Sequence, residues 1–274
     1  MKKLFLILFV GLCLYFLSGC ASLQQLTPEG AKQAEKERVQ ALKIASISET
    51  SGNYQAAVDV YRKLLETDPD NDELLERLGD AYLKGGAPLE AVTIFEKLEE
   101  HHPENPKPLI GLGRTNLALY RPRAAATYFE KAANMAPDNP EALSGLGISR
   151  DMEGAHEAAR LYYVEALSLA PGSGNIRNNL ALSYLMAGQY DAAIETLEKL
   201  AFGPKTSPLY RQNLAMAYGL AGNIKAAKRV AALDLDPSEV TNNLQFYALL
   251  REMKDEKALR HLLLGSDKER GNAG

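Results

Sequence analysis

Apolar residues recur along this chain with the spacing of two short helices joined by a turn. Residues 72–103 show the unit clearly. The first apolar stripe follows the i, i+3, i+4, i+7 spacing of one helical face and consists of Leu75, Leu78, Gly79 and Tyr82. After the break at Gly85-Gly86, a second stripe contains Ala91, Phe95 and Leu98, and Pro103 closes the unit. The pattern predicts a helical hairpin.

This hairpin pattern returns every 34 residues. Six alanines keep the phase, namely Ala57, Ala91, Ala125, Ala159, Ala193 and Ala227. The turn position is held by Gly52, Gly86, Gly154, Gly188 and Gly222, with Tyr120 as the exception. Small residues recur in the first helix at Gly79, Gly113, Gly147, Ala181 and Ala215, and prolines follow four second helices at Pro69, Pro103, Pro137 and Pro171. Because one hairpin cannot bury its apolar face alone, neighbouring units must stack.

The 34-residue helix-turn-helix period resembles the tetratricopeptide repeat. Small residues at two phases allow the helices of a hairpin to approach closely, and a recurring aromatic residue fills the space beside them. These aromatic residues are Tyr61, Phe95, Phe129 and Tyr163. The resemblance implies an all-α fold, a right-handed superhelical solenoid of tetratricopeptide helix-turn-helix repeats.

The first twenty residues have the pattern of a targeting segment. Lys2 and Lys3 precede an apolar run from Leu4 to Leu17, which is shorter than the roughly 20 residues that span a bilayer. The run Leu17-Ser18-Gly19-Cys20 resembles the bacterial lipobox, which implies that residues 1–19 are a removed signal peptide and that Cys20 carries the lipid. Ala21 follows the cysteine, and by resemblance to Gram-negative sorting rules this implies the outer membrane, with the repeats facing the periplasm.

The remaining chain divides into three segments. Residues 20–36 are expected to form the lipidated N-terminus and a tether, although Thr27-Pro28 also has the residues of a helix start. Residues 37–264 are expected to form about six repeats and a degenerate capping hairpin. Residues 265–274 are polar and are expected to form a flexible tail.

Charge and chemistry argue for a binding protein. The formal net charge is −4, and the chain has no basic stripe of the kind that a phosphate backbone requires, so a nucleic-acid partner is not expected. None of the four histidines has a metalloprotease spacing, and the glycines follow the repeat rather than a phosphate-binding loop. We therefore expect no enzyme activity, no cofactor and no metal.

A partner-binding groove is predicted on the first helices of the last repeats, which line the concave side in the repeat family. Asn179, Asn213 and, after a shorter sixth repeat, Asn243 share one phase. The complete predicted set is Asn178, Asn179, Leu182, Met186, Gln212, Asn213, Met216, Leu220, Asn243 and Phe246. Asparagine both donates and accepts hydrogen bonds, so these residues either hold the backbone of an extended peptide or bridge hairpins within the array. Methionine and leucine beside them adapt to apolar side chains.

The C-terminal half shows a narrower resemblance. The runs Asn178–Tyr184 and Gln212–Gly222, followed by Leu235–Val240, resemble the TadD lipoproteins of the tight-adherence (Flp, type IVc) pilus assembly system. This resemblance implies an outer-membrane, pilotin-like scaffold that binds the pilus secretin or another assembly component. A type IVa-like pilotin, or a general periplasmic repeat adaptor that delivers substrates to an envelope protease, would share the lipobox and the repeats.

Overall fold

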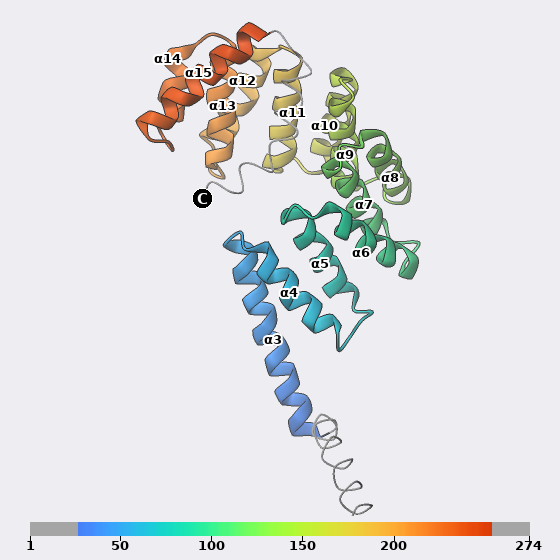
Figure 1. Cartoon of the computed structure of the whole chain (residues 1–274). Helices are drawn as coiled ribbons and strands as arrows, with labels where there is room; N and C mark the ends of the chain where they lie inside the picture. The colour runs from blue at the N-terminus through green and yellow to red at the C-terminus, as the bar shows by residue number, and fades with distance from the viewer. Residues whose placement is uncertain (1–26, 254–274) are drawn as a thin grey trace, which may run out of the picture. The chain divides into compact units, whose positions relative to one another are not determined.

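The computed structural model describes residues 27–253, and every regular element within that range is an α-helix. Along the chain, the described helices alternate between the first and the second helix of six predicted hairpins, and one further helix follows (Figure 1). The chain divides into two compact units between Ala81 and Tyr82, within helix α5. The all-helical solenoid fold that the sequence predicts is confirmed.

The bounds of the helices follow the predicted period. The first helices of the hairpins are α3 (Pro28–Thr50), α5 (Asp72–Lys84), α7 (Pro106–Ala118), α9 (Pro140–Met152), α11 (Gly174–Met186) and α13 (Pro208–Leu220). The second helices are α4 (Tyr54–Leu65), α6 (Pro88–His101), α8 (Pro122–Met135), α10 (His156–Leu169), α12 (Tyr190–Ala201) and α14 (Ile224–Ala231). Helix α15 (Pro237–Met253) follows the sixth hairpin.

Helix α3 begins earlier than the end of the predicted tether. Thr27 caps the helix, because its side-chain oxygen accepts a hydrogen bond of 3.0 Å from the amide of Gly30, and Pro28 occupies the first turn. Residues 28–36, which were assigned to the tether, are therefore helical. The signal peptide, Cys20 and the tail at 265–274 lie outside the described residues, as does the second half of the predicted capping hairpin.

The turn between the two helices of each hairpin requires a left-handed backbone residue. The five glycines at the predicted turn position have φ between 71° and 84°, and Tyr120, which replaces glycine in the third hairpin, has φ 56°. Glycine adopts this conformation without steric cost, whereas tyrosine does not. The sequence exception therefore coincides with the one strained turn among the described residues.

The repeated small residues form the tightest part of the core. All six phased alanines are fully buried, and the recurring aromatic side chains beside them are at most 2% exposed. A Cβ built on Gly113 would lie 2.7 Å from the ring of Phe129, and one built on Gly145 would lie 2.4 Å from the same ring. Phe129 is therefore held between the first helix of its own hairpin and that of the next.

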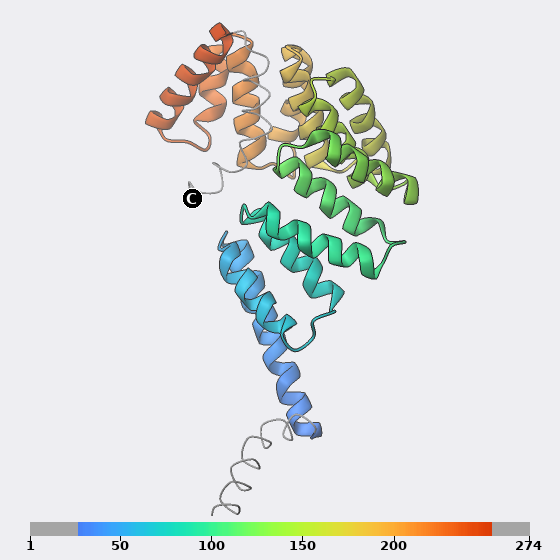
Figure 2. The same cartoon turned by 45° about the vertical axis from the view of Figure 1, so that its right-hand side comes forward.

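Within the second unit, the first helices form the inner side of an arc of helix pairs. Each of α7, α9, α11 and α13 contacts the next first helix in the series, α9, α11, α13 and α15 respectively. Helices α8, α10 and α12 lie on the outer side (Figures 1 and 2). A protein partner that enters this arc meets the first helices.

The array departs from its period near the end of the described chain. Helix α14 has eight residues, fewer than any other described helix. Nε and Nη2 of Arg211 on α13 donate hydrogen bonds to the two carboxylate oxygens of Asp234, which follows α14. The loop between α12 and α13, which contains Phe202-Gly203-Pro204, is two residues longer than the one between α10 and α11. No helix in residues 27–253 is long and apolar enough to cross a membrane.

Candidate partner-binding site

The ten residues of the predicted groove fall into two groups. Five of them are at most 6% exposed, namely Asn178, Met186, Asn213, Met216 and Leu220. The other five retain exposed surface, namely Asn179, Leu182, Gln212, Asn243 and Phe246. The buried five pack within the array and offer a peptide little surface. Ligand binding by the exposed five stays a prediction.

Asn178 and Asn213 bridge two hairpins. The side-chain amide of Asn213 donates a hydrogen bond of 2.8 Å to Oδ1 of Asn178, and Asn213 is 1% exposed. A buried amide without such a partner would cost about 1–3 kcal/mol. Of the two roles considered for the asparagines, bridging within the array is the one that this pair performs.

The phase of the repeat explains why Asn213 is buried. Gly111, Gly145, Asn179 and Asn213 are spaced by 34 residues and share one phase. Cβ atoms built on Gly111 and Gly145 would meet the aromatic ring of the preceding second helix, so this phase faces the preceding hairpin. Leu197 holds the aromatic position in front of Asn213, and leucine is smaller than the phenylalanine of earlier repeats. An asparagine therefore fits where those repeats have glycine.

A different stripe of the first helices remains open. In α13, Leu209 and Gln212 are three residues apart and lie between about 60° and 120° around the helix from Ala215, which has the phase that faces the second helix. Leu209 is 41% exposed and Gln212 is half-buried. Asn175 of α11 and Glu239 of α15 are exposed at the phase of Leu209. With the partly exposed Leu182 of α11 and three exposed residues of α15, Leu209 and Gln212 form what we term the inner stripe: Leu182, Leu209, Gln212, Asn242, Phe246 and Leu249. It offers two amides among four apolar side chains.

A buried polar cluster around Asp151 was missed by the sequence analysis. The Asp151 side chain lies between α9, α10 and α11 and is 1% exposed. Nδ1 of His156 lies 2.7 Å from Oδ1 of Asp151, and the hydroxyl of Ser183 donates to the same oxygen at 2.8 Å. The hydroxyl of Tyr163 donates to Oδ2 at 2.9 Å. The cluster therefore ties the fourth hairpin to the fifth.

Burial sets the electrostatics of this cluster. Desolvation raises the pKa of the Asp151 carboxyl above its usual value, and the hydrogen bonds from His156, Ser183 and Tyr163 act against this increase. Desolvation, together with the nearby carboxylate, raises the pKa of Tyr163 well above its usual value. One feature of the sequence could have indicated this cluster. Asp151 is a charged residue at a repeat position where the preceding and the following repeat have a leucine, Leu117 and Leu185.

The cluster contains a serine, a histidine and an aspartate, but its connections are not those of a nucleophile and its base. The Ser183 hydroxyl donates to Asp151 and to no ring nitrogen in the described contacts, so the hydrogen bond from a serine to a histidine base is absent from this cluster. Residues 27–253 also contain no group of three side chains that could hold a metal ion. The arrangement is structural.

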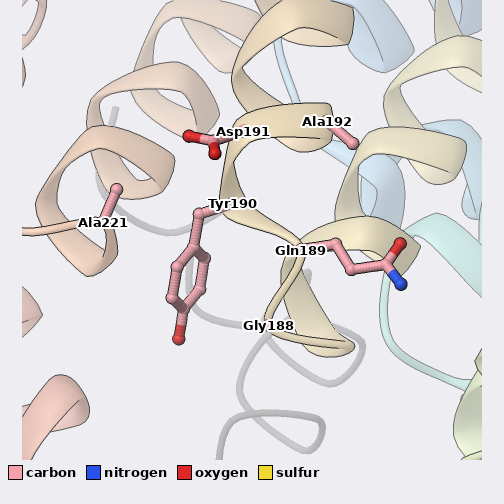
Figure 3. Close-up of a pocket in the computed structure, with 6 residues that line it drawn as sticks. All are labelled: Gly188, Gln189, Tyr190, Asp191, Ala192 and Ala221. Atoms are coloured by element: carbon pink, nitrogen blue, oxygen red, sulfur yellow. The ribbon is translucent and has the colours of Figure 1, made fainter.

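A shallow hollow lies beside the turn that joins α11 to α12. Its lining consists of Gly188, Gln189, Tyr190, Asp191, Ala192 and Ala221. Figure 3 shows the Gln189 side chain on the opposite side of the turn from the ring of Tyr190. The polar groups therefore do not converge on one point, as a small-molecule site would require.

Comparison with known families agrees with the repeat geometry. Family models described as tetratricopeptide repeat match residues 50–108, 110–174 and 152–216. The chain belongs to the tetratricopeptide-repeat family. Members of this family bind protein partners, and their fold is typically an interaction scaffold without catalytic activity. No curated protein matches the chain in sequence.

Solved tetratricopeptide-repeat structures show the same fold. A thermophilic repeat protein from Thermus thermophilus is 22% identical, with a TM-score of 0.61 over 66% of this chain and 98% of that one. A repeat protein from Parabacteroides merdae is 16% identical, with a TM-score of 0.65 over 85% of this chain and 90% of that one. One chain in the structure of the APC/C hetero-tetramer Cut9–Hcn1 is 20% identical, with a TM-score of 0.60 over 86% of this chain and 50% of that one. At these identities the likeness establishes the fold.

Proposed function

We propose that this tetratricopeptide-repeat protein is an outer-membrane lipoprotein, anchored through a lipid on Cys20, that binds the pilus secretin during assembly of a tight-adherence pilus. The lipobox-like run before Cys20 supports the anchor, and the TadD-like runs in the C-terminal half support the pathway. The protein holds its partner and performs no enzymatic step.

The observation that carries the binding role is the inner stripe. Gln212 and Asn242 each offer a donor and an acceptor, which can pair with the main chain of an extended segment. Phe246 and Leu249 beside them are 37% and 53% exposed. Burying such apolar side chains against a partner is favourable, at about 25 cal/mol per Å². A stripe of amides and apolar residues suits an uncharged peptide segment.

Replacing the anchor residue tests the proposed role in cells. We expect Cys20→Ser to move the protein from the outer-membrane fraction to the soluble periplasmic fraction, because a stable anchor requires at least two acyl chains or an equivalent second signal. We also expect fewer secretin multimers in the outer membrane, because their binding partner is no longer held there. Cell fractionation, followed by immunoblotting for this protein and for the secretin, provides the measurement.

The control for this experiment is Ser18→Ala, which changes the same segment and leaves the lipid-bearing residue in place. If the Cys20→Ser protein still sediments with the outer membrane as the wild type does, the anchor is assigned wrongly. If the protein is released and the secretin multimers are unchanged, the anchor stands and the secretin role fails.

A further inference from the structure

Helix α3 has a buried face and an exposed face of different chemistry. Ala45 is fully buried, and α3 packs on α4. At 100° per residue, Lys36 lies about 180° from Ala45, and Lys43 and Ile47 fall within about 20° of Lys36. All three of these side chains are exposed. A cationic and apolar stripe therefore faces away from the hairpin.

In the later repeats, this side of the first helix is buried. The residues in phase with Ile44 are the leucines at 78, 112, 146, 180 and 214, and all of them are at most 9% exposed. The residues in phase with Ile47 are Ala81, Thr115, Ser149, Ser183 and Ala217, and all of them are fully buried. In α3, the first described helix, Ile44 is 50% exposed and Ile47 is 58% exposed. Ile47 is also larger than any residue at its phase.

The charges on this side of α3 favour an anionic occupant. Lys32, Lys36 and Lys43 follow one stripe, and Val39 beside them is 57% exposed. Glu29, in the first turn, shares the stripe, and the exposed Glu37 lies at the edge of the face, about 20° around the helix from Ile44. A second copy of the chain would bring these lysines against lysines, which is unfavourable. Exposed isoleucines flanked by lysines are instead typical of helices that lie in the interface of an anionic membrane.

The position of α3 in the chain suits such a surface. Seven residues lie between Cys20 and Pro28, and the chain between these two residues spans at most about 30 Å. A helix of 23 residues is about 35 Å long. A lipid on Cys20 would therefore keep the start of α3 close to the bilayer.

We propose that the outer face of α3, formed by Lys32, Lys36, Val39, Lys43, Ile44 and Ile47, lies on an anionic phospholipid surface. This inference rests on the proposed anchor for its place in the cell, but the contact itself requires no lipid on the protein. The helix is a second attachment, which makes the anchoring stable and fixes the direction in which the first repeats leave the membrane.

The test uses the full chain from residue 20 with Cys20→Ser, so that no acyl chain contributes. Vesicles of phosphatidylethanolamine and phosphatidylglycerol are compared with vesicles of phosphatidylcholine by co-sedimentation. We expect binding to the anionic vesicles, weakened by salt because exposed charges are screened. Adding Lys36→Glu and Lys43→Glu should reduce this binding on the order of ten-fold or more. Adding Ile44→Ser and Ile47→Ser should also reduce it.

The matched control adds Arg62→Glu and Lys63→Glu on α4, which make the same change in charge at exposed positions outside the outer face. Circular dichroism confirms that each variant is folded. The inference is overturned if the two pairs of charge changes affect binding equally, or if the protein binds both kinds of vesicle alike. A dimer in light scattering that Ile47→Ser dissociates would also overturn it, because the face would then join two copies. Fractionation of the wild-type and Cys20→Ser proteins at high salt, which screens the contact of α3, tests the anchor separately, so failure of either idea can be told from failure of the other.

Discussion

Asp151→Ala is expected to lower the free energy of unfolding by about 2–5 kcal/mol. The substitution leaves the hydroxyl of Tyr163 without an acceptor. It leaves the hydroxyl of Ser183 only its longer hydrogen bond, 3.3 Å, to the backbone carbonyl of His156, and both side chains are fully buried. It also removes the partner of His156, which joins α9 to α10 across their turn. For a chain of this size, the thermal midpoint should fall by about 5–15 °C. Circular dichroism measures this shift.

Two variants make the Asp151 experiment specific. Asp151→Asn keeps an acceptor and a donor at the site without burying a charge, so it should cost less than half as much. Glu157→Ala removes a nearby exposed carboxylate and should leave the midpoint within about 1 °C. Hydrogen exchange should rise first in α9, α10 and α11, because the cluster joins these helices. If Asp151→Ala melts at the wild-type temperature, the cluster does not hold the fourth and fifth hairpins together.

Gly145→Leu is expected to destabilise the protein by about 1–3 kcal/mol or more, because it overpacks the contact between two hairpins. The Cβ alone would lie 2.4 Å from the ring of Phe129, which is 1% exposed and has little room to move. Phe129→Ala alone should cost about 3–5 kcal/mol by leaving a cavity. In the double variant the leucine fills part of that cavity, so the combined loss should be smaller than the sum of the two.

Thermal and urea unfolding of the four proteins measure this coupling. Gly172→Ala serves as the control, because a Cβ built there meets no atom within 4 Å, and it should leave stability nearly unchanged. Strictly additive losses for Gly145→Leu and Phe129→Ala would show that position 145 does not face the ring, and the assigned phase of the first helices would then be wrong.

The helix pairs and their turns could be predicted from the sequence because each rests on a local rule repeated six times. The alanines in phase with Ala159 are all buried, as close packing of two helices requires. Even the irregular turn at Tyr120 was marked in the sequence, because tyrosine stands where the other units have glycine, and it has the same positive φ. When six units share one pattern, a deviation in a single unit, such as Tyr120, does not change the predicted helix bounds.

The binding residues were harder to predict because the side of a helix that faces a neighbour depends on the superhelix. Asn179 and Asn213 share a phase, and that phase was assigned to the groove. The structure shows that it faces the preceding hairpin, so Asn213 pairs with Asn178 instead of a ligand. Comparison with the glycines at 111 and 145 would have indicated crowding at this phase, since glycine recurs where helices approach closely.

The Asp151 cluster escaped the sequence analysis for a different reason. Its members come from three helices, and Asp151 lies 32 residues from Ser183, so no local spacing relates them. The informative feature was instead a single aspartate at a phase where neighbouring repeats have leucine.

The central claim is that a protein partner binds the inner stripe of the last repeats, and site-specific photocrosslinking in cells tests it most directly. A photoreactive p-benzoylphenylalanine is placed at Gln212 or Phe246 on the inner stripe, and in separate proteins at Leu161 or Glu195. The last two positions are exposed on the second helices α10 and α12, and Leu161 is 74% exposed. After irradiation, crosslinked products are identified by mass spectrometry. We predict a crosslink to the secretin from Gln212 and Phe246 and none from Leu161 or Glu195. A secretin crosslink from the outer positions alone would contradict the claim.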